Sequence, residues 1–282
     1  MIKPVLIGGS SFIGSQILKF SSIDFLTTYN TKKISQGKKF DLLKDKISNV
    51  IDLNEYQNFI ILSSYTNPEF CEFNKKISDD LNIKYTKLLI DELIYHNKKI
   101  IFFSTEYVYS GFKGNYKESD PSEQINRYAQ QKFYIENYIV NNAKDFIIFR
   151  LAKTYSLIDL WKDFHSQWIK KFILNKEKQI SCFSNQIFSP ISSIEVALVL
   201  ETFLKKEING IFNLGGAESY SRLECLKHFL NKFKIKDVHI DQTLIDAKKL
   251  GWNMPENVSM NIDKILELDL PIKSYRTNLN EL

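Results

Sequence analysis

Apolar and polar positions along the first half of the chain form blocks that predict strands and helices in turn. Short, nearly continuous apolar runs end in small or polar residues, as the buried strands of a parallel sheet do. Between them lie longer stretches with apolar positions three and four residues apart, which predict helices. The predicted strands cover residues 3–8, 23–29, a short piece before Asp41, 57–63, 99–104 and 145–151, and the predicted helices cover 12–20, about 76–97 and a stretch starting at Asn126. This order predicts an α/β fold with a Rossmann-type, doubly wound parallel sheet.

Within the long helix near residue 76, the residues at helical spacing are expected to be packing positions. They are Leu81, Tyr85, Leu88, Leu89 and Leu93.

The pattern is looser after Arg150. It predicts an aromatic-rich helix from Trp161 to Lys178, a helix from about Ser193, a strand over 210–216 and a helix from near Ser221. We therefore expect a Rossmann domain over residues 1–153, to which 184–206 return, and a smaller α/β substrate-binding lobe over 154–183 and 207–282. The cleft between them would be the substrate pocket.

A glycine-rich turn joins the first predicted strand to the first helix. The segment GGSSFIG contains Gly8, Gly9 and Gly14, with Ser11 between them. Such a turn lets the backbone approach a pyrophosphate at a helix N-terminus. An ordinary strand-to-helix turn explains the same residues, so it is the position at the start of the chain that favours a phosphate site.

Two later stretches carry the candidate chemistry. FFSTEYVYSG (102–111) is predicted to be a strand that breaks into a polar turn, and it contains Thr105. NRYAQQK (126–132) opens a helix on which Tyr128 and Lys132 lie one turn apart on the same face. A hydroxyl, a phenol and an ammonium in one pocket suit proton delivery to a carbonyl while a hydride arrives from the other side. We expect the Lys132 ammonium to favour the Tyr128 phenolate.

Taken alone, the Tyr-x-x-x-Lys spacing has a plainer explanation. A tyrosine packed on the sheet and a lysine whose stem lies along the surface would give the same pattern. The order and context of both segments are needed to favour catalysis.

Composition narrows the function classes. The net charge is +5 with scattered basic residues, which gives no case for nucleic acid but suits an anionic small ligand. The three cysteines are far apart, which argues against a disulfide framework and suits a reducing compartment. No apolar run approaches the ~20 residues of a membrane span, so we expect a cytoplasmic protein without membrane contact. No acidic cluster suggests a metal, and none is predicted.

The segments GGSSFIG, FSTEYVYSG, YAQQK, SNQIFSP and GIFNLGGAESYSR together resemble the extended short-chain dehydrogenase/reductase family, and within it the dTDP-4-dehydrorhamnose reductase group. The resemblance covers nearly the whole chain. It implies that Thr105 is the catalytic hydroxyl, Tyr128 the proton donor and Lys132 the lysine that binds the nicotinamide ribose.

The resemblance also implies cofactor contacts along the first domain. They are Gly8, Ser11, Phe12, Ile13 and Gly14 at the pyrophosphate, Asp41 and Leu42 at the adenine, Ser63, Ser64 and Tyr65 at the wall after the fourth strand, and Tyr128 and Lys132 at the ribose. Asn82 matches a structural asparagine of the family. Asp41 has a second explanation, because it would also cap the next turn.

Two departures from the family pattern affect the site. Ser11 stands where a central glycine is usual. After Arg150, the segment Leu151-Ala152-Lys153 replaces Thr-Ser-Trp, in a wall that touches the sugar in the resemblance. The candidate substrate contacts are Thr66, Tyr107 and Lys153. The changed wall bears on which sugar is bound rather than on the reaction.

The cofactor choice depends on the end of the second strand. An acid there binds the ribose hydroxyls of NAD, whereas basic residues accommodate the extra phosphate of NADP. The chain has Asn30 followed by Thr31, Lys32 and Lys33, which favours NADPH and leaves NADH open. A pair of solvated lysines explains the same residues.

The expected activity is NADPH-dependent reduction of the 4-keto group of a nucleotide-linked 4-keto-6-deoxysugar, in sugar synthesis for surface polysaccharide. The alternatives are a nucleotide-sugar epimerase or dehydratase of the same superfamily, and a non-catalytic regulatory subunit that keeps the fold and cofactor. The oligomeric state is left open, with a homodimer as one option because dimers are common in this superfamily.

Overall fold

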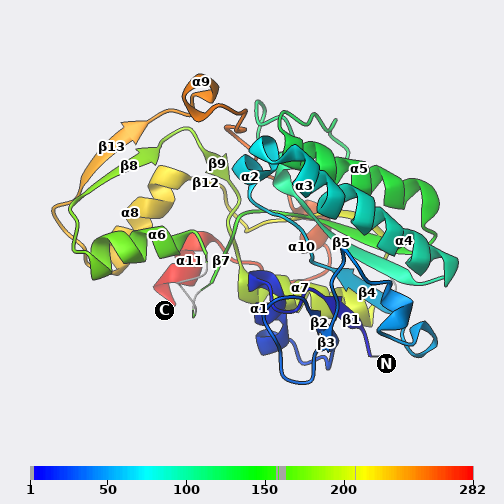
Figure 1. Cartoon of the computed structure of the whole chain (residues 1–282). Coiled ribbons are helices and arrows are strands. Elements are labelled where there is room, and N and C mark those ends of the chain that lie inside the picture. Colours follow the sequence, from blue (N-terminus) through cyan, green and yellow to red (C-terminus); the bar gives the residue numbers. More distant parts are fainter. Residues whose placement is uncertain (1–2, 157, 159–162, 207, 282) are drawn as a thin grey trace.

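The computed structural model describes residues 3–156, 158, 163–206 and 208–281. Its larger part is built on a seven-stranded parallel sheet (Figure 1). The strands are β1 (Val5–Ile7), β2 (Leu26–Tyr29), β3 (Lys38–Lys39), β4 (Asn58–Ile61), β5 (Lys99–Thr105), β6 (Phe146–Leu151) and β11 (Gly210–Leu214). Their order is β11-β6-β5-β4-β1-β2-β3, so the direction of winding reverses between β1 and β4. Ligands of such sheets bind at the carboxyl edge beside this reversal.

Helices cover both faces of the sheet because both faces are apolar. In β1, Leu6 belongs to the core under α1 (Phe12–Phe20) and α7 (Ser193–Lys205), whereas Val5 and Ile7 belong to the core on the other face. That second face is covered by α4 (Thr86–Tyr95) and α5 (Arg127–Asn142). Side chains that alternate between two buried faces produce the continuous apolar strands seen in the sequence.

Short helices complete this domain at the carboxyl edge. α2 (Pro68–Phe73) is followed by α3 (Lys75–Asp79), which continues through a π-helical segment, Asp80–Tyr85, into α4. Figure 1 shows α3, α4 and α5 lying together on one side of the sheet.

The smaller lobe lies at the left of Figure 1 and has its own aromatic core around Trp168, Phe229 and Tyr275. Its elements are β7 (Thr154–Tyr155), α6 (His165–Trp168) with a π-helical continuation Ile169–Leu174, β8 (Gln179–Phe183), β9 (Ile187–Phe188), β10 (Ile191–Ser192), β12 (Tyr220–Ser221), α8 (Arg222–Lys232), β13 (His239–Thr243), α9 (Ala247–Leu250) and α11 (Tyr275–Asn280). α10 (Asp263–Leu266) instead packs on β11, and its Ile265 belongs to the core under α7. β8 pairs with β13, β7 with β10, and β9 with β12.

The predicted fold class is confirmed, but three local predictions are wrong. Gly210–Leu214 was assigned to the lobe, yet as β11 it pairs in parallel with β6 at the edge of the central sheet. Its buried residues Phe212 and Leu214 complete the core under α7. Leu88 was expected to pack, but 53% of its surface is exposed. The division of the chain into two domains stays a prediction.

The third wrong prediction is the single helix over Trp161–Lys178. Among the described residues of this stretch, helical structure covers His165–Leu174 and changes from α to π at Ile169. Trp161 lies outside the described residues. In the part of the chain that the structure describes, no helix combines the length and apolar character needed to cross a membrane.

Candidate active site

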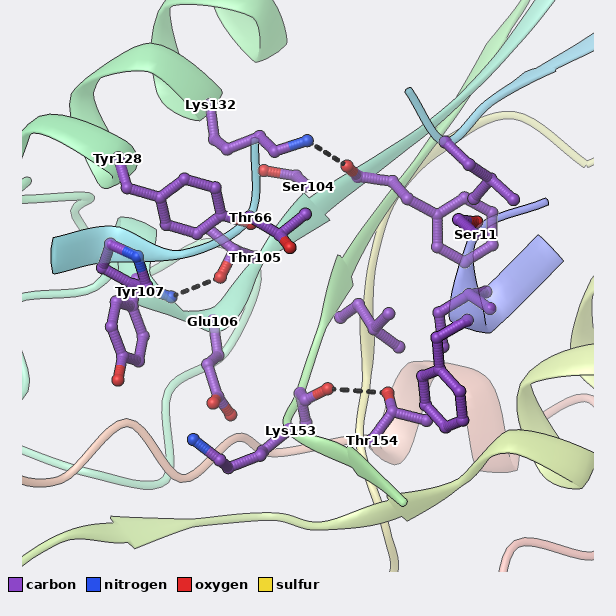
Figure 2. Close-up of a pocket in the computed structure, with 17 residues that line it drawn as sticks. Ser11, Thr66, Ser104, Thr105, Glu106, Tyr107, Tyr128, Lys132, Lys153 and Thr154 are labelled. Atoms are coloured by element: carbon purple, nitrogen blue, oxygen red, sulfur yellow. Dashed lines mark hydrogen bonds between the residues drawn. The ribbon is translucent and has the colours of Figure 1, made fainter. Parts of the chain in front are cut away.

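A cavity of about 370 Å³ lies at the carboxyl edge of the sheet. Because parallel strands all end at this edge, the turn after β1, the turn after β5 and the end of β6 converge there. Figure 2 shows Ser11 from the start of α1 on one side and Tyr128 and Lys132 from α5 on the other. Of the predicted site residues, the cavity brings together Ser11, Phe12, Ile13, Thr66, Thr105, Tyr107, Tyr128, Lys132 and Lys153.

The Thr105 hydroxyl lies where β5 becomes a turn. Its oxygen accepts a hydrogen bond from the Tyr107 backbone N–H at 3.3 Å, and the Tyr128 side chain lines the same cavity beside it. Tyr128 is only 7% exposed and stands in the first turn of α5. Asn126 begins this helix as predicted, because its side chain accepts from the Ala129 N–H at 3.0 Å. The cap therefore fixes the entry of the helix that carries the phenol.

Lys132 is buried beside Tyr128, with 5% of its surface exposed. Its Nζ donates to the Phe103 carbonyl oxygen at 2.9 Å and lies 4.7 Å from the centre of the Phe102 ring. Burial lowers the pKa of Lys132 to about 8, against smaller opposing effects from Cys71 and Glu136. The lysine is thus held against the end of β5 by a backbone carbonyl.

The expected lowering of the Tyr128 pKa is wrong for this arrangement. Burial raises the pKa of Tyr128 well above its usual value, and the neighbouring Thr105 hydroxyl only partly opposes this. The Lys132 ammonium points to the Phe103 carbonyl and lies 6.0 Å from the Tyr128 ring centre. Tyr128 is therefore a protonated phenol, the form that donates a proton.

Glu106 is a pocket residue that the sequence interpretation did not single out. It follows Thr105, is 4% exposed, and lies below Thr105 in Figure 2 with its carboxyl near Lys153. Burial raises the pKa of Glu106, and the Lys153 charge opposes the rise. Among the described residues, Glu106 Oε2 and Ser104 Oγ are buried without a hydrogen-bond partner. Buried polar atoms of this kind usually need a ligand or water.

A second cavity of about 510 Å³ adjoins the first and extends into the lobe. Both are lined by Thr66, Tyr107 and Lys153, so these side chains stand at the junction of the two cavities. The second also contains Arg222, whose guanidinium donates to Gln167 at 2.7 Å. Burial and then the Arg222 charge lower the pKa of Lys153. Two cations therefore lie close together at the junction, where an anion would relieve their repulsion.

The glycine turn has the close packing that a dinucleotide site requires. Gly8 has a φ of +90°, which favours glycine, and a Cβ on Gly14 would lie 2.7 Å from the Gly8 carbonyl oxygen. A Cβ on Gly8 would lie 2.9 Å from Ser63 Oγ, so the end of β4 is directly beside the turn. Ser11 caps α1 by accepting from the Gly14 N–H at 3.1 Å. These residues fit a pyrophosphate, with Ser11 stabilising the turn from within.

The other predicted cofactor residues lie outside this cavity. Ser64 and Tyr65 follow β4 and donate hydrogen bonds to Asn82. Asn30 and Lys32 follow β2 and are exposed at the surface. The Asp41 carboxylate accepts from the Leu43 N–H at 3.1 Å and thus caps a turn. Leu42 is buried in the core under α4. Their roles at a cofactor stay predictions.

Comparison with known proteins agrees with this geometry. Residues 3–282 match the family model described as the RmlD substrate binding domain. The chain belongs to this family. A dTDP-4-dehydrorhamnose reductase from Aggregatibacter actinomycetemcomitans is 25% identical over 206 residues, which cover 72% of this chain and 68% of that protein. Methionine adenosyltransferase 2 subunit beta from Mus musculus is 19% identical over 237 residues, covering 81% and 71%.

The same fold is found in a dTDP-4-dehydrorhamnose reductase from Bacillus anthracis, solved in complex with NADP. The TM-score is 0.83 at 18% identity, with 100% of this chain and 98% of that chain covered. The resemblance to the reductase group and the predicted oxidoreductase class are confirmed by these matches. Glu106 and Arg222 are not among the predicted site residues. The sequence features that pointed to them were an acidic residue directly after Thr105 and an arginine inside the segment GIFNLGGAESYSR.

Proposed function

We propose that this member of the family uses NADPH to reduce the 4-keto group of a nucleotide-linked 4-keto-6-deoxysugar. The observation that carries the proposal is the Tyr128 phenol, beside Thr105 and Lys132, in a cavity that faces the glycine turn. A phenol, a hydroxyl and an ammonium at one cavity wall suit reduction of a carbonyl.

Tyr128, Thr105 and Lys132 would each have a separate role in the reduction. Tyr128, protonated because it is buried, gives its proton to the carbonyl oxygen of the sugar. Thr105, which lies beside the phenol, would donate a hydrogen bond to the same oxygen. Lys132 supplies positive charge that stabilises the resulting phenolate. General acid catalysis of this kind contributes about 10²–10⁴-fold in rate.

The bound dinucleotide would supply the hydride. Gly8, Ser11 and Gly14 would hold its pyrophosphate at the N-terminus of α1, and the wall after β4 would lie along it. Asn30 and Lys32, without an acid beside them, favour the phosphorylated form of the dinucleotide. NADPH is therefore the proposed cofactor.

The shape and charge of the cleft support a nucleotide sugar. The sugar would occupy the cavity beside Tyr128, with its polar groups facing Thr66, Tyr107 and the unpartnered Oε2 of Glu106. A diphosphate would meet Lys153 and Arg222 at the junction. The aromatic and apolar wall of the second cavity, which includes Trp252, suits a base.

Two alternatives make different predictions. An epimerase or dehydratase of the superfamily would convert the sugar without net oxidation of the dinucleotide. A non-catalytic subunit would bind the dinucleotide and convert nothing, and the name of the second relative makes it a subunit of a methionine adenosyltransferase. The buried, complete set of Thr105, Tyr128 and Lys132 favours catalysis.

The deciding experiment measures oxidation of NADPH and NADH at 340 nm with a panel of 4-keto-6-deoxy nucleotide sugars. We expect rapid oxidation of NADPH with one of them. Tyr128→Phe should abolish turnover and leave NADPH binding intact, whereas Tyr134→Phe, an exposed tyrosine on the same helix, should do neither. Near-normal turnover by Tyr128→Phe would overturn the mechanism. Binding of NADPH without oxidation by any sugar would favour the alternatives.

A further inference from the structure

Gln131, the residue before Lys132, is buried completely and points away from the cavity into a polar network between helices. Its Oε1 accepts from Asn82 Nδ2 at 2.7 Å, and its Nε2 donates to Ser78 Oγ at 2.7 Å and to Asp79 Oδ1 at 2.8 Å. Both donors and the acceptor are used. A buried glutamine with this many partners fixes the position of its helix in more than one direction.

The far side of the network is the loop after β4. Asn82 Oδ1 accepts from the Tyr65 N–H at 2.8 Å and from Ser64 Oγ at 2.9 Å, and Nδ2 donates to the Tyr65 carbonyl at 2.9 Å. One side-chain amide thus pairs with both backbone groups of Tyr65. Ser64 and Tyr65 belong to the wall proposed to lie along the dinucleotide, so Asn82 connects this wall to Gln131.

The orientation of the Gln131 amide is set by charge. Burial alone would raise the pKa of Asp79, but hydrogen bonds from Arg127 and Gln131 and the charge of Arg127 outweigh it and hold that pKa below its usual value. Asp79 is therefore an ionised acceptor, which requires the Gln131 NH₂ group to face it. The Gln131 carbonyl oxygen must then face Asn82.

The backbone at Asn82 supports this arrangement. Asn82 lies in the π-helical segment Asp80–Tyr85, between the regular helices α3 and α4. π-Helical turns are rare in proteins overall, and those that occur are often found at functional sites. At the other end, Arg127 and Gln131 are one turn apart on α5, and both contact Asp79. The catalytic helix is thus held at two successive turns.

We propose that Gln131 is a positioning residue, which sets the place of Lys132 and of the Ser64–Tyr65 wall relative to one another through Asn82. Gln131 contacts neither cavity, so it acts only through these groups. The inference rests on the proposed dinucleotide site but on no particular sugar. Loosening the network would change cofactor binding and turnover together.

The test replaces Gln131 with methionine, which keeps length and removes the hydrogen bonds. NADPH binding is followed by the fluorescence of the nicotinamide ring, which needs no sugar. We expect the Kd for NADPH to rise about ten-fold. With the sugar that the NADPH oxidation assay identifies, kcat should fall about 10- to 100-fold, because small displacements of reacting groups have effects of this size. The control is Asn137→Met, which replaces an exposed side-chain amide on the same helix and should stay within about two-fold of the wild type.

A double-mutant cycle separates coupling from general damage. Asn82→Ala should raise the Kd for NADPH, and adding Gln131→Met should raise it little further, because both residues lie on one path. Effects that multiply would overturn the proposal, as would a Gln131→Met Kd equal to that of the control. If Gln131→Met loses activity only in proportion to its unfolded fraction, and its Kd for NADPH is unchanged, Gln131 has a structural role only and the proposal is overturned.

If Gln131→Met does not fold, Ser78→Ala removes one hydrogen-bond acceptor of Gln131 and should raise the Kd in the same direction by about two- to five-fold. An unchanged Kd in folded Ser78→Ala would then overturn the proposal. A wild-type protein that binds neither NADPH nor NADH would overturn the proposed function itself. Wild-type binding with no effect of the variants would overturn only the role of Gln131.

Discussion

Replacing Lys132 with methionine should make the protein more stable while it abolishes turnover. Lys132 is 5% exposed, and burial lowers the pKa of its ammonium group from 10.5 to about 8. A change of this size corresponds to about 3 kcal/mol by which folding disfavours the charged form. Methionine keeps most of the packing of the stem, and the Phe103 carbonyl loses a donor at about 1 kcal/mol. The expected net gain in the free energy of unfolding at pH 7 is about 1–2 kcal/mol.

The gain should depend on pH in a defined direction. The folded wild type binds fewer protons than the unfolded chain between about pH 8 and pH 10.5, so its own stability rises through that window. The advantage of Lys132→Met is therefore largest below pH 8 and shrinks as the pH rises toward 10.5. Urea unfolding followed by tryptophan fluorescence at pH 7 and pH 9.5 measures this difference.

The matched control is Lys144→Met, which removes an exposed lysine and should change stability equally at both pH values. The reasoning would be refuted if Lys132→Met were less stable than the wild type at pH 7. It would also be refuted if the gain were the same at pH 7 and pH 9.5, because the ammonium would then carry no cost of burial.

Three other changes test the surroundings of the site. Arg150→Met leaves Glu136 buried without the guanidinium that lies 2.8 Å away, so urea unfolding should show a loss of about 3–5 kcal/mol, largely recovered in the double variant with Glu136→Leu. Glu106→Gln removes a carboxyl group whose pKa is raised by burial to about 8, although the charge of Lys153 opposes the rise. The melting temperature of the wild type should therefore fall more steeply from pH 5 to pH 8 than that of the variant, and parallel curves would contradict this. Asn126→Ala removes the cap of α5 and should lower the free energy of unfolding by about 1 kcal/mol, whereas Asn126→Ser should nearly preserve it.

Local pattern was enough for the fold class and the catalytic candidates. The buried strands β1, β4, β5 and β6 carry continuous apolar runs, because both faces of a parallel sheet are covered. The helix start at Asn126 and the one-turn spacing of Tyr128 and Lys132 follow from cap chemistry and helical geometry, which involve only neighbouring residues. These features depend on short stretches of chain and can therefore be predicted from them.

Only the tertiary structure decided how the site is charged and supported. Lys132 turns to the Phe103 carbonyl and Tyr128 stays a phenol, because burial by the whole fold outweighs the attraction between two neighbours. Glu106 meets Lys153 because β5 and β6 end side by side, and Gln131 meets Asn82 because α5 packs on a π-helical turn. Desolvation and long-range contacts are sums over residues far apart in the chain. The amino-acid sequence thus determined which groups are present, and the packing of distant segments determined what those groups can do.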